Sequence, residues 1–405
     1  MESFRTAIRE AVGELGRERQ EIPGVVLVSG KGNSEEPVIR ESYGYLSLDS
    51  GAPLDLQSTF WLASCTKLLT TIACLQLVER GLVDLDEDIT RVLHEYQDLQ
   101  ILVGFGGDGE PLTRPAKNKL TLRHLLTHSS GIGYDFLSES IQRYRMYNGL
   151  SVLGKGESLM EWGFAPLLFE PGEGWAYGAS MDWAGLVVER IGGHKSLEEY
   201  MSINIWEPLG MTSTSFRFYD RPEISSPEHF ATLLNRNTEG RLGTETIDYS
   251  TKTYHFDGGG SGLFSRPTDF AKVLNSLLRN DGTVLKKETV PMMFQPQLPE
   301  EAQFLRQFLQ KIPEGFRDAF LGGFPFEKEF NWGLGGLLAM EDVPGGRKKG
   351  SLSWGGMPNH AWWIDPSSKL YGFFATHMAP FGEKTVQAFA RRYERALYQE
   401  FESTD

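Results

Sequence analysis

Apolar residues recur at helical spacing near both ends of the chain. They occupy one face of each segment, while Arg and Glu occupy the other. The stripe within residues 3–17 consists of Phe4, Ala7, Ile8, Ala11, Val12 and Leu15, and the second stripe of Val386, Phe389, Ala390, Tyr393, Ala396 and Leu397. Runs rich in β-branched and aromatic residues lie just inside both stripes, at 25–28, 39–45, 361–364 and 371–375. This order predicts an antiparallel sheet that is built from both ends of the chain and flanked by two terminal helices.

The long middle segment has a different pattern. Helical stretches at 122–126 and 181–191 alternate with Gly and Pro, and no internal repeat or low-complexity tract is present. We therefore expect an α+β fold. Residues 1–81 and 250–405 would form a lobe around the sheet, and residues 82–249 a mostly helical inserted lobe, with the site in the cleft between them.

Composition narrows the class of protein. Of the 405 residues, 40% are hydrophobic and 12% aromatic, as is typical of a folded globular chain. The net charge of −14 disfavours nucleic acid and acidic membrane surfaces as partners. No stretch approaches the roughly 20 apolar residues of a membrane helix, and the charged opening segment does not resemble a signal peptide. Cys65 and Cys74 point in different directions on one predicted helix and cannot form a disulfide. Together with the missing membrane and signal segments, this predicts a soluble cytoplasmic protein.

The apolar run 68–78, which stops at Glu79-Arg80-Gly81, predicts a buried helix that ends at this glycine. Two residues of complementary chemistry lie at its start, Ser64 in the first turn and Lys67 one turn later. Ser64 and Lys67 are three residues apart, so a helix places the hydroxyl and the amine on one face. The helix N-terminus favours negative charge developing near Ser64, and burial of Lys67 favours its neutral amine, which can accept a proton. The pair predicts a nucleophile and its base, although Ser-x-x-Lys alone occurs by chance in many proteins.

Two further segments support this interpretation. Tyr177 lies in a turn before a predicted helix, where its phenol can exchange protons in a shared cavity. The sequence Trp354-Gly355-Gly356-Met357 precedes a predicted strand, and its glycines let a strand edge approach a substrate carbonyl. We expect the backbone N–H groups of Ser64 and Met357 to form an oxyanion hole. Taken alone, Tyr177 is better explained by packing and Trp-Gly-Gly by a turn.

In this order, the three segments resemble the motifs of the serine β-lactamase and penicillin-binding-protein superfamily, which are Ser-x-x-Lys, Tyr-x-Asn or Ser-x-Asn, and Lys-Thr-Gly. Segments 81–86, 122–131 and 204–211 are similar to its class C and esterase branch. Segments 175–185 and 347–352 are similar to the fungal transesterases of the lovastatin acyltransferase type, which acylate polyketides. The resemblance runs from the first helix to the last. It implies the fold of that superfamily, a covalent acyl-serine, and ester or thioester substrates.

Two positions depart from the superfamily motifs. Ala179 stands two residues after Tyr177, where lactam-cleaving members have Asn, and Trp354 replaces the Lys of Lys-Thr-Gly. Without that cation the site lacks a partner for a lactam carboxylate, and an indole offers apolar surface instead. β-Lactam hydrolysis is therefore disfavoured.

The other candidate motifs do not indicate a metal site, a phosphate loop or a second hydrolase fold. His124 and His128 are four residues apart on a predicted helix, as two metal ligands would be, but no Glu lies between them and a structural role is favoured. The run Gly258–Gly262 is not followed by the Gly-Lys-Ser/Thr of a phosphate loop, so it more simply allows a turn or a close backbone approach. The Gly-x-Ser-x-Gly elbow of α/β-hydrolases is absent. No metal or organic cofactor is implied.

These observations predict a serine-dependent acyl transfer. Ser64 would attack an ester or thioester while Lys67, coupled to Tyr177, removes its proton, and the acyl group would pass to water or to an alcohol of a small hydrophobic, polyketide-like metabolite. An acyl carrier protein is a possible donor. The alternatives are a carboxylesterase, a β-lactam or D-amino-acid peptide hydrolase, and a catalytically silent scaffold that binds a metabolite or a carrier. The expected substrate-binding residues are Trp61, Tyr134, Trp175, Trp354, Gly355 and Gly356.

Overall fold

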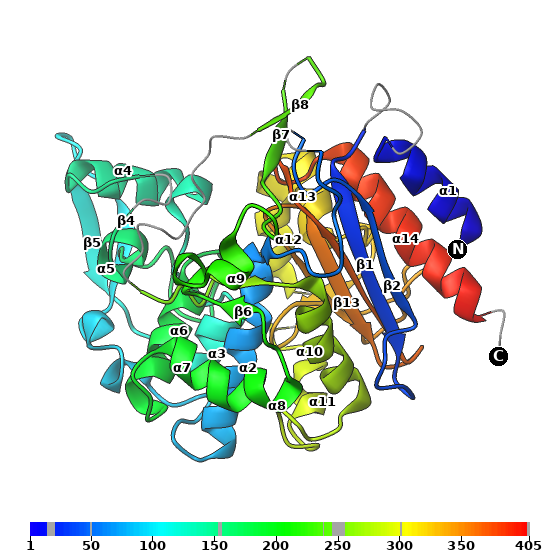
Figure 1. Cartoon of the computed structure of the whole chain (residues 1–405). Coiled ribbons are helices and arrows are strands. Elements are labelled where there is room, and N and C mark those ends of the chain that lie inside the picture. The colour runs from blue at the N-terminus through cyan, green and yellow to red at the C-terminus, as the bar shows by residue number, and fades with distance from the viewer. Residues whose placement is uncertain are drawn as a thin grey trace.

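The computed structural model describes residues 1–13, 21–48, 51–152, 156–237, 239–244, 256–299 and 302–402. A seven-stranded antiparallel sheet lies at its centre, in the order β10-β11-β12-β13-β14-β1-β2 (Figure 1). Its strands are β1 (Gly24–Lys31), β2 (Ile39–Gly44), β10 (Phe330–Trp332), β11 (Leu337–Ala339), β12 (Leu352–Gly356), β13 (His360–Asp365) and β14 (Leu370–Thr376). The two ends of the chain meet where β1 pairs with β14, from Val25 opposite Thr376 to Lys31 opposite Leu370.

The central strands are apolar on both sides, so both faces of the sheet are covered. Val25 and Leu27 pack in one cluster with residues of α1 (Glu2–Ala11) and α14 (Lys384–Glu402), whereas Val26 and Val28 belong to the larger core on the opposite face. Helix α10 (Pro267–Arg279) packs against β1, β13 and β14. The terminal helices α1 and α14 lie side by side along the sheet (Figure 1).

The elements predicted at the two ends of the chain are confirmed. Each of the four predicted strands matches β1, β2, β13 or β14, and the last helix matches α14. The first helix ends at Ala11, and Gly13 turns the chain with a φ of +79°. Leu15, which was predicted on the same stripe, lies outside the described residues.

The regular structure of the described residues between 82 and 244 is mainly helical, as expected, but it also contains an unpredicted hairpin. In that hairpin β4 (Gln100–Phe105) pairs with β5 (Pro111–Pro115). Polar residues and an irregular register near Gly104 hide the alternation that identifies a strand. The α-helices are α3 (Leu122–Leu126), α4 (Glu139–Tyr147), α5 (Leu159–Gly163), α6 (Ser180–Ile191), α7 (Leu197–Met201), α8 (Glu207–Leu209) and α9 (Pro222–Ser225). Short helical turns cover η3 (Ile89–Arg91), η4 (His94–Tyr96), η5 (Asp135–Leu137), η6 (Ser202–Trp206) and η7 (Phe218–Asp220).

Two small sheets and several helices complete the fold. One sheet joins β3 (Phe60–Trp61), β9 (Phe264–Ser265) and β6 (Thr214–Ser215), and the other joins β15 (Met378–Ala379), β7 (Leu234–Arg236) and β8 (Leu242–Thr244). The remaining helices are η2 (Ala63–Cys65), α2 (Thr66–Glu79), α11 (Val290–Met293), α12 (Gln303–Lys311) and α13 (Glu314–Leu321). The division into two lobes stays a prediction, and its boundary at 249/250 falls outside the described residues.

Helix α2 is the central helix of the core. Twelve of its residues are buried, which explains why its sequence is apolar on nearly every side. It packs against α6 and ends before Gly81, whose φ is +68°, as the sequence predicted. Cys65 and Cys74 are both buried and free, so the predicted absence of a disulfide between them is confirmed.

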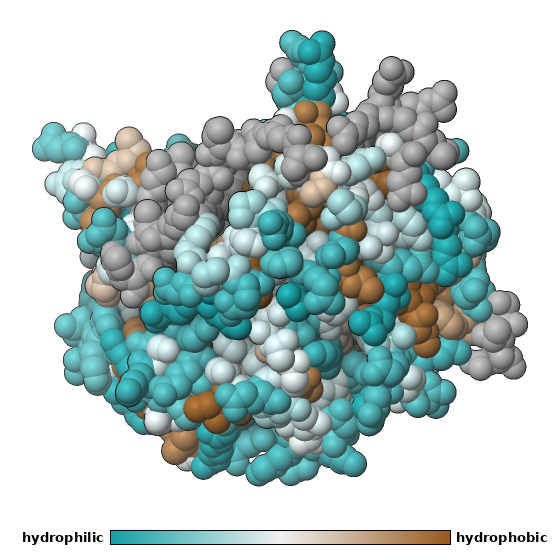
Figure 2. Space-filling view, viewed as in Figure 1, coloured by the Kyte–Doolittle hydropathy of each residue, from teal (hydrophilic) through white to brown (hydrophobic). Residues whose placement is uncertain are grey.

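The face shown in Figure 2 is mainly hydrophilic, and one of its groups of apolar side chains lies over α4 and the β4–β5 hairpin. The exposed apolar residues of these elements are Val103, Leu112, Met146 and Tyr147. Among the described helices, none combines the length and the apolar composition needed to cross a bilayer.

Candidate active site

The candidate nucleophile lies in a tight turn between a strand and a helix. Strand β3 ends at Trp61, the turn η2 contains Ser64, and α2 begins two residues later. Ala63 has a φ of +47°. This backbone conformation costs energy for a residue with a side chain, so the surrounding structure must hold it in place. Ser64 therefore lies in the turn that precedes α2, not in the first turn of that helix as predicted.

Three polar side chains meet at Ser64. Lys67 Nζ donates to Ser64 Oγ at 3.1 Å, and Tyr177 Oη donates to the same oxygen at 2.8 Å. The ammonium of Lys67 lies 4.6 Å from the centre of the Tyr177 ring. Ser64 comes from η2, Lys67 from the next turn of α2, and Tyr177 from the loop that leads into α6. The structure therefore brings together the three residues predicted from the sequence, within the reach that proton transfer requires.

Lys67 is held from several directions and is only 2% exposed. Besides Ser64, its Nζ donates to the carbonyl oxygen of Gly260 at 2.7 Å and to Tyr134 Oη at 3.5 Å. These three contacts hold the amine beside Ser64, and it accepts the Ser64 proton in its neutral form. The run Gly258–Gly262 thus makes the close backbone approach that the sequence predicted, and its target is Lys67.

Aromatic rings enclose Tyr177. The indole Nε1 of Trp354 donates to Tyr177 Oη at 3.3 Å, and the Tyr134 ring meets the Tyr177 ring edge-on at 5.6 Å. Trp175 stacks at 6.2 Å from Tyr177 and is 4% exposed, so it lies behind the tyrosine and supports it. Trp61 is half-buried, and its Nε1 donates to the carbonyl oxygen of Ser261 at 2.7 Å.

The end of β12 packs directly against the nucleophile turn. A Cβ atom on Gly356 would lie 2.5 Å from the carbonyl oxygen of Leu62 and 3.4 Å from Cys65 Sγ, so only glycine fits there. Met357 follows Gly356 in the turn to β13. Within the described ranges, the backbone N–H groups of Ser64 and Met357 donate to no protein acceptor, which leaves both amides available to a substrate oxygen.

His360, the first residue of β13, links the sheet to the nucleophile turn. Its Nδ1 accepts from the N–H of Thr376 at 3.2 Å, and its Nε2 lies 2.9 Å from the carbonyl oxygen of Trp61, to which it donates. Burial lowers the pKa of His360 to about 4, because a charged imidazole would lose its hydration. The neutral ring therefore fixes the strand that precedes Ser64.

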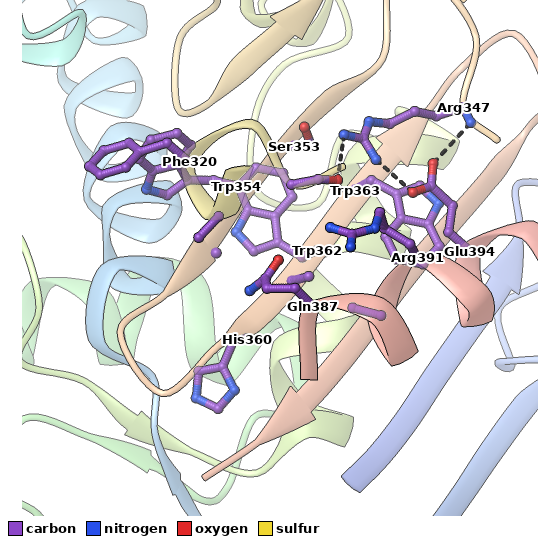
Figure 3. A pocket seen from close by; sticks show the side chains of 15 residues that line it. Phe320, Arg347, Ser353, Trp354, His360, Trp362, Trp363, Gln387, Arg391 and Glu394 are labelled. Atoms are coloured by element: carbon purple, nitrogen blue, oxygen red, sulfur yellow. Dashed lines mark hydrogen bonds and ion pairs between the residues drawn. The ribbon is translucent and has the colours of Figure 1, made fainter. Parts of the chain in front are cut away.

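A narrow crevice runs behind the site, between the β12–β13 hairpin and the helices α13 and α14 (Figure 3). Phe320 and Trp354 lie at one end. At the other end Arg347 Nη1 forms a buried ion pair with Glu394 Oε2 at 2.8 Å (Figure 3). This ion pair joins the loop before β12 to the last helix.

The two histidines considered as metal ligands do not form a metal site. Helix α3 ends at Leu126, and His128 lies beyond it with a φ of +58°, so the two residues do not share a helix as predicted. His128 is buried and packs against the Tyr177 ring at 4.7 Å, and burial lowers its pKa well below the ordinary value. The described residues contain no group of three side chains able to hold a metal ion.

Some features of the site escaped the sequence analysis. Tyr134 was expected as a pocket wall, yet its hydroxyl also accepts from Lys67. The carbonyl oxygen of Gly260 and the carboxylate of Asp182, which accepts from the Gly260 N–H at 2.9 Å, were not predicted. A backbone carbonyl has no residue type to identify it, and Asp182 is read as an ordinary acid in the first turn of a helix.

Comparison with known families identifies the class of protein. The family described as Beta-lactamase matches residues 4–396, which is nearly the whole chain. The chain therefore belongs to this family, as its motifs predicted.

Similar proteins narrow the class further. The chain is 36% identical over 403 residues to the ML-236A carboxylate methylbutanoyltransferase of Penicillium citrinum, covering 96% of this chain and 94% of that protein. It is 39% identical over 341 residues to the lovastatin esterase of Penicillium rubens, covering 83% and 84% of the two chains. The predicted class of enzyme, an acyltransferase or esterase of the serine β-lactamase type, is confirmed by these relatives.

Solved structures agree with the sequence relatives. A mutant of simvastatin synthase from Aspergillus terreus superimposes with a TM-score of 0.89 at 35% identity, covering 99% of this chain and 97% of that chain. The more distant EstCE1, described as a hydrolase with promiscuous acyltransferase activity, shares the fold with a TM-score of 0.74 at 19% identity, over 97% of this chain and 98% of its own. The predicted fold, a β-lactamase and transpeptidase-like α+β structure with a central antiparallel sheet, is confirmed.

Proposed function

We propose that the protein transfers an acyl group from an ester or thioester donor to an alcohol through an acyl-Ser64 intermediate. One observation carries this proposal: Ser64 Oγ lies within hydrogen-bonding distance of both Lys67 Nζ and Tyr177 Oη. A nucleophile with an adjacent base and a second proton-transfer group is the arrangement that covalent acyl transfer requires.

In the first half-reaction, Ser64 Oγ bonds to the donor carbonyl carbon while its proton passes to the neutral amine of Lys67. The carbonyl oxygen becomes an oxyanion between the N–H groups of Ser64 and Met357. Tyr177 Oη, 2.8 Å from Ser64 Oγ, protonates the departing alcohol or thiol as the tetrahedral intermediate collapses, and it recovers a proton from Lys67. The products are acyl-Ser64 and the free leaving group.

In the second half-reaction the same groups act in reverse. Tyr177 first passes its proton to Lys67 and then removes the proton of the acceptor hydroxyl. The acceptor oxygen attacks the acyl-serine carbonyl, and Ser64 leaves with the proton that Lys67 now holds, which returns all three groups to their starting states. Water in place of the alcohol gives hydrolysis. No metal or organic cofactor takes part in this scheme.

The chemistry around Tyr177 supports a hydrophobic substrate. Trp354 stands where lactam-cleaving members have a lysine, and its ring contacts Tyr177 and Phe320 at 5.5 and 5.3 Å between centroids. A site walled by such rings suits an apolar acyl chain and a polyketide-like acceptor. The printed names of the relatives, a methylbutanoyltransferase acting on ML-236A carboxylate and a lovastatin esterase, support the same substrate class.

The donor can be a free thioester or one carried by an acyl carrier protein. The exposed apolar residues Val103, Leu112, Met146 and Tyr147 on α4 and the β4–β5 hairpin offer a surface for such a carrier. We place the reaction in fungal secondary metabolism and in the cytoplasm, where thiols such as Cys65 and Cys74 stay reduced.

The test is the mass of the intact protein after brief mixing with p-nitrophenyl butyrate, followed by peptide mapping. A butanoyl-sized gain on the Ser64 peptide, absent in Ser64→Ala, is expected. Cys65→Ala is the matched control because it removes the neighbouring side chain, a buried thiol, and it should keep the adduct. Without an adduct in the wild type, the covalent mechanism is wrong and a binding scaffold becomes the better explanation.

Hydrolysis is the second candidate, favoured by the similarity to the lovastatin esterase. Adding an acceptor alcohol to the acylated protein separates the two functions, and the alcohol used is monacolin J acid, which the printed name of a relative from Aspergillus terreus, the monacolin J acid methylbutanoyltransferase, gives as its substrate. Transfer predicts a new ester of this alcohol, detected by mass spectrometry, and faster loss of the adduct. An esterase predicts only the free acid, at a rate that the alcohol does not change.

A further inference from the structure

The glycine-rich run Gly258–Gly262 is clamped between two helices beside the candidate nucleophile. Thr70 Oγ1 on α2 donates to the carbonyl oxygen of Gly259 at 2.7 Å, and Thr66 Oγ1 accepts from the N–H of Leu263 at 3.2 Å. On the other side, Gly259 packs on α6, where a Cβ on Gly185 would lie 3.3 Å from the Gly259 Cα. The run is therefore a fixed part of the core.

Asp182 connects this run to Lys67. It lies in the first turn of α6 and is 2% exposed. Its Oδ1 accepts from the Gly260 N–H at 2.9 Å, and the carbonyl oxygen of Gly260 accepts from Lys67 Nζ at 2.7 Å. A Cβ on Gly260 would lie 2.4 Å from Asp182 Oδ2, so the contact needs glycine. Gly260 thus donates one hydrogen bond to the carboxylate through its N–H and accepts one from the base through its carbonyl oxygen.

Packing alone does not explain why the other carboxylate oxygen of Asp182 is buried. Oδ2 is buried and, among the described residues, has no hydrogen-bond partner. Burial raises the pKa of Asp182 to about 6, while the nearby positive charge of Lys67 opposes that rise. A buried, half-satisfied carboxylate is costly, so its bond to the Gly260 N–H contributes something that apolar packing at this position would not.

We propose that Asp182 is a positioning residue for the acyl-transfer reaction: by binding the Gly260 N–H it fixes the backbone at Gly260, so that the carbonyl oxygen of the same residue holds Lys67 Nζ against Ser64. This inference rests on the proposed function. It adds Asp182, which does not touch the substrate, to the residues on which the reaction depends. Lys67 has a flexible stem of four carbons, and a small displacement of its amine would remove it from the reach of Ser64.

The test measures the rate of acylation of Ser64 by p-nitrophenyl butyrate in single turnovers, as a function of ester concentration. Asp182→Ala should lower the saturating rate about 100-fold, the loss typical of a catalytic group displaced by about 1 Å. The half-saturating ester concentration should stay within about threefold of the wild-type value, because Asp182 makes no substrate contact. Asp182→Asn keeps an oxygen acceptor for the Gly260 N–H. It should be acylated at least tenfold faster than Asp182→Ala, because the hydrogen bond matters more than the charge.

Two further variants separate positioning from folding. Gly260→Ala should slow acylation as Asp182→Ala does, because its Cβ displaces the same peptide. Asp269→Asn is the matched control, since Asp269 is also buried and accepts a backbone bond, from the Ser213 N–H at 2.8 Å, but lies outside the site. It should acylate at the wild-type rate.

The outcomes are distinct. If wild type is acylated and folded Asp182→Ala is acylated equally fast, the positioning role is wrong and the proposed function survives. A variant that loses stability in urea but keeps its rate per folded molecule overturns the inference in the same way. If Asp182→Ala does not fold, Gly260→Ala decides, and a folded Gly260→Ala that is acylated at the wild-type rate overturns the inference. If wild type itself forms no adduct, the proposed function fails and the inference with it.

Discussion

The neutral state of His360 makes the stability of the fold depend on pH in a way that can be calculated. The imidazole is fixed by the Thr376 N–H on one nitrogen and the Trp61 carbonyl on the other, and a second proton would break the first of these bonds. In the unfolded chain its pKa returns to the ordinary 6.5, whereas burial lowers it to about 4 in the folded protein. Between these two values the unfolded chain binds more protons, so stability is fully present above pH 6.5 and falls with decreasing pH.

The magnitude follows from the two values. At pH 5.0 the unfolded imidazole is almost fully charged and the folded one is mostly neutral, which removes about 2 kcal/mol of folding free energy relative to pH 7.5. His377, whose pKa burial lowers to about 3, acts in the same direction. Acidification should therefore unfold the region around the nucleophile turn together with the sheet.

Urea unfolding of wild type and His360→Gln at pH 7.5 and 5.0 measures this effect. The variant should be less stable at pH 7.5, because a flexible glutamine does not hold both of the bonds that the rigid imidazole makes. Its loss of stability on acidification should be smaller by about 2 kcal/mol. His94→Gln, at an exposed histidine, should keep the wild-type dependence. If wild type and His360→Gln lose the same stability between the two pH values, the buried neutral imidazole is not the cause.

Three shorter predictions test other parts of the structure. Removing the partner of the buried Arg347 with Glu394→Ala should lower the free energy of unfolding by about 3–5 kcal/mol in urea titrations, and a loss below 1 kcal/mol would contradict a buried ion pair. Gly356→Ala should slow acylation strongly, because its Cβ would push β12 away from the nucleophile turn. Gly107→Ala should not, because nothing lies within 4 Å of the Cβ that it adds, and equal acylation rates in the two variants would refute this packing. Tyr177→Phe should lower the acylation rate by about 10²–10⁴-fold in stopped-flow assays, and wild-type kinetics in this variant would remove Tyr177 from the mechanism.

Sequence patterns predicted the parts of the fold that repeat over several residues. The apolar stripes of α1 and α14 and the runs of β1 and β14 each contain enough positions for the helical or extended period to be recognised. The β4–β5 hairpin was missed because its strands are short, partly exposed and irregular in register. Local periodicity carries no signal there.

The features of the candidate site also differ in whether the sequence predicts them. Ser64, Lys67 and Tyr177 were predicted because motif spacing and residue type together indicate their chemistry, and the structure places them in contact. The Gly260 carbonyl lies 193 positions from Lys67 in the chain, and its role depends on tertiary packing. Ala63, with its strained φ of +47°, shows the same limit, since its sequence gives no sign of an unusual backbone.

The pairing of β1 with β14 also has a consequence for synthesis on the ribosome. The hairpin of β1 and β2 emerges early, yet the partner of β1 lies more than 300 residues later, from Leu370 to Thr376. At translation rates of about 5–20 residues per second, the open edge of β1 waits for roughly 20 to 70 seconds. During that time a strand destined to be buried on both faces is exposed. The nascent chain therefore depends on protection of this edge, and its yield in a cell should respond to chaperone supply more than its final stability would indicate.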